Sequence, residues 1–155
     1  MKIQLCYASS RQGLADDLID DLSNILTVAR DFNSKNAVFG VLYYANNAFF
    51  QCLEGEDFIV LPLFESIKKD ARHNSIIEFE VKKIQKYSFK NWSMKYVQKS
   101  SKVDIFFNRL GCEEFIPSVL NDQNLNGLLE ALLNENQTRV RKRVGLNQRG
   151  IHPYL

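Results

Sequence analysis

The stretch AVFGVLYYANNAFFQCLEGE, residues 37–56, forms the centre of the predicted fold. It consists of two apolar runs separated by the pair Asn46-Asn47. Because asparagine tolerates the positive φ that a two-residue hairpin turn requires, the stretch predicts a β-hairpin. If the two strands pair directly about this turn, Leu42 faces Gln51 across the hairpin.

Gln51 is a polar residue within the apolar second strand of this hairpin and therefore needs an explanation. It lies inside the second apolar run, on the same strand face as Phe49 and Leu53. A buried amide without partners costs about 1–3 kcal/mol. Gln51 therefore either reaches solvent at a sheet edge or has several hydrogen-bond partners inside the protein.

The chain up to residue 98 reads as alternating strands and helices. Period-two or short apolar runs predict strands, and apolar spacings of three and four predict helices. The predicted elements are strand 2–9 (half-buried), helix 15–32, strands 38–44 and 48–54, helix 58–72, and strands 76–86 and 92–98. The order βαββαββ predicts an α+β, ferredoxin-like mixed sheet with two helices on one face.

The pattern changes after the last predicted strand. Two short amphipathic helices are predicted at 104–120 and 124–136, and we expect them to cover the other face of the sheet. The basic segment 139–155 has no apolar period and is expected to be a mobile tail. The predicted division is therefore a domain at 1–98, a helical extension at 99–138 that caps the sheet or carries output, and this tail.

Composition excludes several classes of protein. The 155 residues are 45% hydrophobic and 25% charged with a net charge of +2, the balance of one globular domain without a nucleic-acid or membrane bias. No apolar run approaches the roughly 20 residues of a membrane span, and the N-terminus lacks the apolar region of a secretory signal. Three widely spaced cysteines form neither a disulfide framework nor a zinc pattern. We expect a cytoplasmic protein without a metal site.

Four polar side chains fall on or beside apolar faces of the predicted elements: Tyr7, Asn33 and Gln51 on such faces, and Asp70 at the edge of one. Each has a structural explanation by itself, such as a helix cap for Asn33 or a solvated helix end for Asp70. Together they converge on one space between the two helices, walled by Ile25 and Ile67. Apolar walls with a few convergent polar groups predict a pocket for a flat small molecule.

Five motifs in this chain resemble the BLUF domain, a flavin-binding blue-light sensor. They are LCYASS with Tyr7, ARDFNSKNAVFGVLYY with Asn33, FFQCLEGE with Gln51, IKKDARH with Asp70, Arg72 and His73, and FKNWSMKYV with Trp92 and Met94. The resemblance covers residues 1–98, in matching order. With two helices following, the chain is similar to the short stand-alone bacterial photoreceptors of this family.

The resemblance implies that FAD is held between the two helices of the 1–98 domain. The implied contacts are Ile25 and Ile67 on the ring faces, Asn33 at the C4 carbonyl edge, Asp70 on the pyrimidine side, and Arg72 and His73 beside the outer part of the cofactor. Phe32 and Ser66 depart from the family pattern, because other members often carry polar or basic residues there.

The resemblance also implies a sensor without net chemistry rather than an enzyme. On blue-light excitation Tyr7 would pass an electron and a proton to the flavin, and the Gln51 amide would rearrange by rotation, tautomerisation or both. Trp92 and Met94 alternate on the last strand, so both could face the flavin and relay the change. Output would pass through the C-terminal helices to a partner protein, expected to be a transcriptional regulator, with self-association also open.

The alternative is a ferredoxin-like module without photochemistry that binds RNA or another ligand. RNA binding would use exposed aromatic residues of the hairpin, but this hairpin carries no lysine or arginine. The four cations of the tail lack interleaved aromatic residues, so direct nucleic-acid binding is not expected. An enzyme is disfavoured because neither His73 nor His152 pairs with a cysteine in any recognisable motif.

Overall fold

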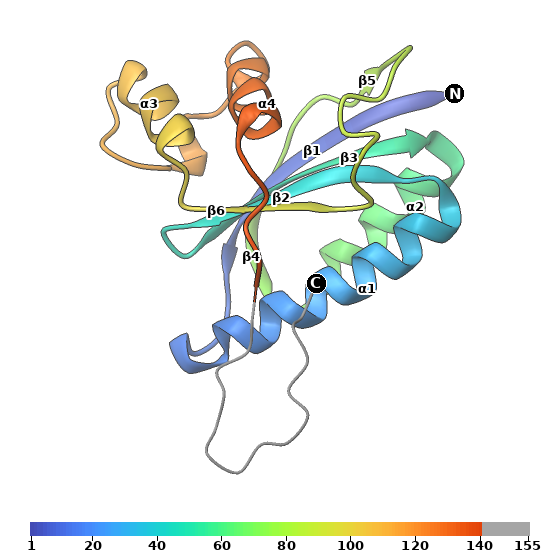
Figure 1. Cartoon of the computed structure of the whole chain (residues 1–155), viewed down its shortest axis with the longest axis horizontal. Helices are drawn as coiled ribbons and strands as arrows, with labels where there is room; N and C mark the ends of the chain where they lie inside the picture. The colour runs from blue at the N-terminus through green and yellow to red at the C-terminus, as the bar shows by residue number, and fades with distance from the viewer. Residues whose placement is uncertain (141–155) are drawn as a thin grey trace.

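The computed structural model describes residues 1–140, and residues 141–155 lie outside the described part (Figure 1). Its strands and longer helices are β1 (Lys2–Arg11), α1 (Leu18–Asn36), β2 (Phe39–Ala45), β3 (Ala48–Glu56), α2 (Asp57–Lys68), β4 (His73–Glu78), β5 (Lys82–Lys83), β6 (Lys95–Gln98), α3 (Ser101–Arg109) and α4 (Leu125–Asn134). Two short 3₁₀ turns, Ala15–Asp17 and Pro117–Val119, precede α1 and α4.

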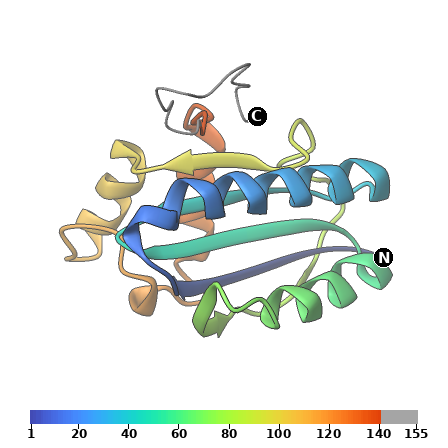
Figure 2. The same ribbon diagram turned by 90° about the horizontal axis from the view of Figure 1, so that it is seen from below.

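The strands form one mixed sheet in the order β4-β1-β3-β2-β6, with the short β5 paired to β1. The β2–β6 pair is parallel, and the other pairs are antiparallel. Helices α1 and α2 lie side by side on one face, and α3 and α4 lie on the other (Figures 1 and 2). This confirms the ferredoxin-like α+β fold with two C-terminal helices on the opposite face.

The hairpin has the predicted turn and register. Asn46 and Asn47 have φ angles of 57° and 59°, and Leu42 pairs with Gln51. On the other side of β3, Gln51 pairs with Tyr7 of β1. Gln51 therefore lies on a central strand and is not at a sheet edge.

Both faces of the sheet are buried, so the prediction of a half-buried first strand is wrong. Gln4, Cys6 and Ala8 of β1 are 8%, 2% and 0% exposed. Cys6 and Ala8 pack in a cluster with residues of α3 and α4, including Phe107 and Leu132. Helices α3 and α4 cover the strand face that would be exposed if helices packed on only one side of the sheet.

Several element boundaries differ from the prediction for local reasons. Helix α1 continues to Asn36, and α2 ends at Lys68, before the charged segment that leads into β4. Helix α3 spans 101–109 instead of extending to 120: the Ser100 side chain caps its start by accepting from the Val103 amide, and Gly111 with φ 85° follows its end.

The chain leaves α4 and crosses the edge of the sheet beside β6. The Thr138 amide donates to the Tyr96 carbonyl over 2.7 Å, and Val140 is buried in the cluster between the sheet and α1–α2. Most of the predicted 139–155 tail lies outside the described residues. Among the helices of residues 1–140, none has the length and apolar character of a membrane span.

A buried carboxylate anchors the connector that leads into β6. Glu54 is 0% exposed, and its two oxygens accept from the Gln4 side-chain amide over 2.9 Å and from the Phe89 backbone amide over 2.8 Å. Further along, the Gly40 amide donates to the Trp92 carbonyl. These bonds fix the path of the chain just before Met94.

We predict that Glu54→Leu destabilises the fold by about 1–3 kcal/mol, because the buried Phe89 amide and Gln4 side chain lose their acceptor. Glu54→Gln is the matched control, since its carbonyl can still accept from Phe89. Urea unfolding of both variants measures the difference, and an equal loss in both would contradict this role of the carboxylate.

Candidate functional site

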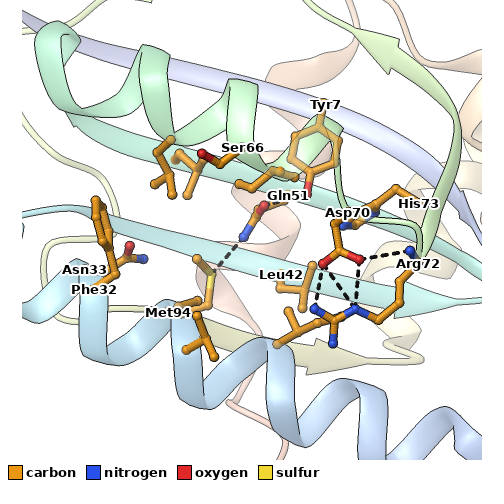
Figure 3. A pocket seen from close by; sticks show the side chains of 16 residues that line it. Tyr7, Phe32, Asn33, Leu42, Gln51, Ser66, Asp70, Arg72, His73 and Met94 are labelled. Carbon is orange, nitrogen blue, oxygen red and sulfur yellow. Dashed lines mark hydrogen bonds and ion pairs between the residues drawn. The ribbon is translucent and has the colours of Figure 1, made fainter.

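A cavity of about 270 Å³ lies between α1 and α2 over the sheet (Figure 3). Ile25 and Ala29 of α1 and Leu63 and Ile67 of α2 line it. Each pair is four residues apart, so both members lie on one helix face. The polar lining residues are Tyr7, Asn33, Gln51, Ser66, Asp70, Arg72 and His73. The four predicted polar residues are thus brought together between the predicted apolar walls.

Tyr7 and Gln51 form a hydrogen-bonded pair at the floor of this cavity. The Tyr7 hydroxyl donates to Gln51 Oε1 over 2.6 Å, and the two residues are 1% and 3% exposed. Burial and the nearby Asp70 carboxylate raise the pKa of Tyr7, so its hydroxyl keeps its proton. The tyrosine ring packs against Phe64, with centroids 5.1 Å apart.

The other end of the Gln51 amide has a weak partner. Its Nε2 lies 3.8 Å from Met94 Sδ, and a thioether is a poor acceptor (Figure 3). Because the amide nitrogen carries two hydrogens, Gln51 retains donor capacity beside the cavity. An acceptor atom of a bound ligand would satisfy it.

Asn33 is 1% exposed and lines the cavity from α1. Its Nδ2 donates to the Ser93 carbonyl over 2.6 Å, which ties α1 to the connector before β6. The helix-cap explanation is wrong, because α1 continues for three residues beyond Asn33.

Asp70 and Arg72 form an ion pair at the opposite end of the cavity. Arg72 Nε lies 3.0 Å from Asp70 Oδ1 and Nη2 lies 2.6 Å from Oδ2, while Nη1 donates to Asn24 of α1. The guanidinium holds the pKa of Asp70 below its usual range, so the carboxylate is charged at neutral pH. The pair bridges the segment after α2 to α1.

His73 is partly buried beside Ser9 and two aromatic rings. Its Nδ1 lies 2.8 Å from Ser9 Oγ, and its ring meets the rings of Tyr7 and Phe49 edge-on. Burial lowers the pKa of His73; Asp70 opposes this shift and Arg72 adds to it. His73 is therefore neutral at pH 7 and contributes no charge to the cavity.

Met94 lines the cavity, and Trp92 does not. Trp92 packs with the cluster on the opposite face of the sheet, 6.3 Å from the Phe89 ring. The expectation that both residues face the flavin side is wrong for Trp92, because β6 begins only at Lys95. Residues 92–94 precede β6 and include a bend at 93–94, so the period-two alternation of a strand does not apply to them.

Sequence reasoning left out some of the residues that line the cavity. Val28 and Leu63 both line it, and they lie three and four residues from the predicted walls Ile25 and Ile67. Helical spacing could have found them. Ser9, the partner of His73, carried no such signal because its contact depends on the pairing of β1 with β4. The described residues contain no cluster of three potential metal ligands.

The chain belongs to the BLUF family, the sensors of blue light using FAD, whose family model matches residues 3–95. It is a flavoprotein photoreceptor, and FAD is its cofactor. The cavity fits such a group: it has apolar walls on two facing helices, a buried amide donor without a strong partner, and polar groups at both ends.

Solved structures support this assignment. The chain is 50% identical to BlsA in its ground state, with 96% of this chain and 100% of BlsA covered and a TM-score of 0.87. For the photo-activated state of BlsA the identity is 51%, the coverage 90% and 99%, and the TM-score 0.85. BlrB, a BLUF protein in its dark state, is 25% identical over 85% of this chain and 95% of BlrB, with a TM-score of 0.70.

A curated relative shows a different setting for the same domain. The photoactivated adenylate cyclase subunit beta of Euglena longa is 32% identical over 69 residues, which are 44% of this chain and 8% of that protein. Since so little of the cyclase is matched, its catalytic activity does not carry over. The family and the near-complete BlsA and BlrB matches place this chain among the sensors, not the enzymes.

The buried His73 predicts a pH dependence of stability. Its folded pKa is lowered, so below about pH 6.5 the unfolded chain binds more protons, and the stabilisation present above that pH is lost as the pH falls toward the folded pKa. Asp70, also with a lowered pKa, acts in a lower window, below about pH 3.9.

We expect His73→Gln to reduce the loss of stability between pH 7.5 and 5.5. Urea midpoints at both pH values, with the same excess of FAD in every sample, measure it. An unchanged loss in the variant would show that another group titrates in this window.

Proposed function

We propose that Tyr7 and Gln51 are the light-responsive pair of this blue-light sensor, and that Met94 carries their rearrangement toward β6. The observation that carries the proposal is the 2.6 Å bond from the Tyr7 hydroxyl to Gln51 Oε1, made beside the cavity while Gln51 Nε2 has only a sulfur partner. This pair is buried, so bulk water does not compete for its hydrogen bonds.

The remaining lining residues position the cofactor. We propose that Ile25 and Ile67 hold the two faces of the flavin ring, that Asn33 and Asp70 bind its polar edges, and that Arg72 and His73 lie near the outer part. Their support is that they line the cavity on opposing walls and at both ends. When bound, FAD supplies the absorption of blue light and the redox chemistry of its ring.

The amide of Gln51 can be satisfied in more than one arrangement. In the observed one, Oε1 accepts from Tyr7 and Nε2 faces Met94. If the two ends of the amide exchange places, an oxygen instead of a donor faces the methionine sulfur. If the amide tautomerises in place, the nitrogen still faces the sulfur but keeps only one hydrogen, so its lone pair can face the sulfur instead. Sulfur in a thioether donates no hydrogen bond, so the new arrangement loses the contact between the Gln51 amide hydrogen and Met94 Sδ.

We further propose that residues 1–98 sense light and residues 99–138 carry the output to a partner protein. Helices α3 and α4 bury one face against the sheet, while Ile105, Ile116 and Leu133 remain 50%, 39% and 37% exposed. Exposed apolar side chains suit a protein partner, and we propose a transcriptional regulator. The described cysteines are free thiols, in keeping with a reducing cytoplasm.

Purified protein with FAD is expected to shift its flavin absorbance to the red under blue light and to recover in darkness. Gln51→Leu and Tyr7→Phe should still bind FAD but lose the shift, because each removes one member of the hydrogen-bonded pair. Light-minus-dark absorbance spectra measure this.

Tyr43→Phe is the matched control for Tyr7→Phe. Tyr43 is also buried in the sheet, but its hydroxyl accepts from Ser100 on the face of α3 and α4. It should retain the full shift. A normal shift in Gln51→Leu, or a wild-type protein that shows none, would overturn the proposed function.

Met94→Ala should keep the spectral shift and lose the response of the output helices, because the link from Gln51 to the strand is cut. Hydrogen exchange of residues 101–134, compared in light and darkness, measures that response. A light-dependent change equal to that of the wild type would contradict the role of Met94.

A further inference from the structure

Lys95, the first residue of β6, is a buried cation. The residue is 1% exposed, and its side chain lies on the sheet face covered by α3 and α4. Its Nζ donates to the Leu133 carbonyl, in the last turn of α4, over 3.0 Å. The same ammonium lies 4.3 Å from the centroid of the Trp92 ring.

The charge of Lys95, and not only its apolar stem, contributes to the contact between β6 and α4. Within residues 1–140 no carboxylate lies at ion-pair distance from Lys95, although burying an ammonium is unfavourable unless polar groups replace its hydration. The replacements here are an aromatic face and the carbonyl end of a helix, both of which attract cations. The charge therefore holds the end of α4 to β6 in a way that an apolar side chain cannot.

Lys95 directly follows the residue that contacts Gln51. Met94 points into the cavity on one face of the sheet, and Lys95 points to α4 on the other. One peptide bond joins the two residues, and its carbonyl, that of Met94, accepts from Arg30 Nε over 3.0 Å. A displacement of Met94 thus moves the backbone from which Lys95 projects.

We propose that Lys95 is a positioning residue that transmits the displacement of Met94 to the last turn of α4. This inference rests on the proposed function, in which the Gln51 amide displaces Met94. The proposed link across the sheet runs from Met94 Sδ on the cofactor side to Lys95 Nζ and the Leu133 carbonyl on the output side.

The end of α4 has other attachments, and they provide a control. Lys102 Nζ donates to the Asn134 carbonyl over 2.7 Å, and the Ser100 hydroxyl donates to Glu135 Oε2 over 2.5 Å. Both come from α3 or its cap. Lys102 is therefore a lysine of α3 that binds the same end of α4 without following Met94 in the chain, and unlike Lys95 it is exposed.

The experiment compares wild type, Lys95→Met and Lys102→Met, each as the full chain with FAD bound. Hydrogen exchange of residues 130–135 is measured by mass spectrometry in darkness and under blue light, and the absorbance shift is recorded for each sample. We expect all three to keep the red shift. The light-minus-dark exchange difference should be present in wild type and Lys102→Met, and lost in Lys95→Met.

Failure of the Lys95 relay and failure of the proposed light-sensing function give different results in this experiment. A wild type without a red shift contradicts the proposed function. If Lys95→Met shows the red shift and keeps the light-minus-dark exchange difference of the wild type, the relay is overturned. This includes the result expected of a merely structural residue, in which exchange rises by the same amount in light and in darkness and the difference between them is unchanged. If Lys95→Met does not fold, wild type alone decides: no light-dependent change at residues 130–135 also overturns it.

Discussion

The hydrogen bond between Tyr7 and Gln51 is the interaction on which the organisation of this protein depends. It joins two central strands at the floor of the cavity and uses the oxygen end of an amide whose nitrogen end, among residues 1–140, has only a sulfur partner. A well-satisfied glutamine would be a rigid core residue. We propose that this one exchanges its hydrogen-bond partners, which is the property that a sensor needs.

The rest of the fold serves this pair from both sides of the sheet. Helices α1 and α2 shield it from water and line the cavity with apolar side chains. On the other face, α3 and α4 bury the strands that carry the pair. The bend at residues 93–94 matters most, because with it Met94 lies on one face of the sheet and Trp92 on the other.

The polar side chains around the pair each have a fixed hydrogen-bond or ion-pair partner. Asp70 is paired with Arg72, His73 is neutral against Ser9, and Asn33 is bonded to the connector before β6. Glu54 holds the same connector from the opposite face. A fixed frame around one adjustable amide lets a small local change be transmitted instead of being absorbed.

The sequence by itself determined the hairpin, its register and the faces of Tyr7, Gln51 and Asn33, because turn residues and side-chain periodicity are local properties. Recognition of the family followed from short motifs in order. Only the tertiary structure decided where the helices end and that Trp92 and Met94 lie on opposite faces of the sheet. Those features depend on contacts between segments far apart in the chain, such as Phe89 with Glu54 and Lys95 with Leu133, which no local pattern encodes.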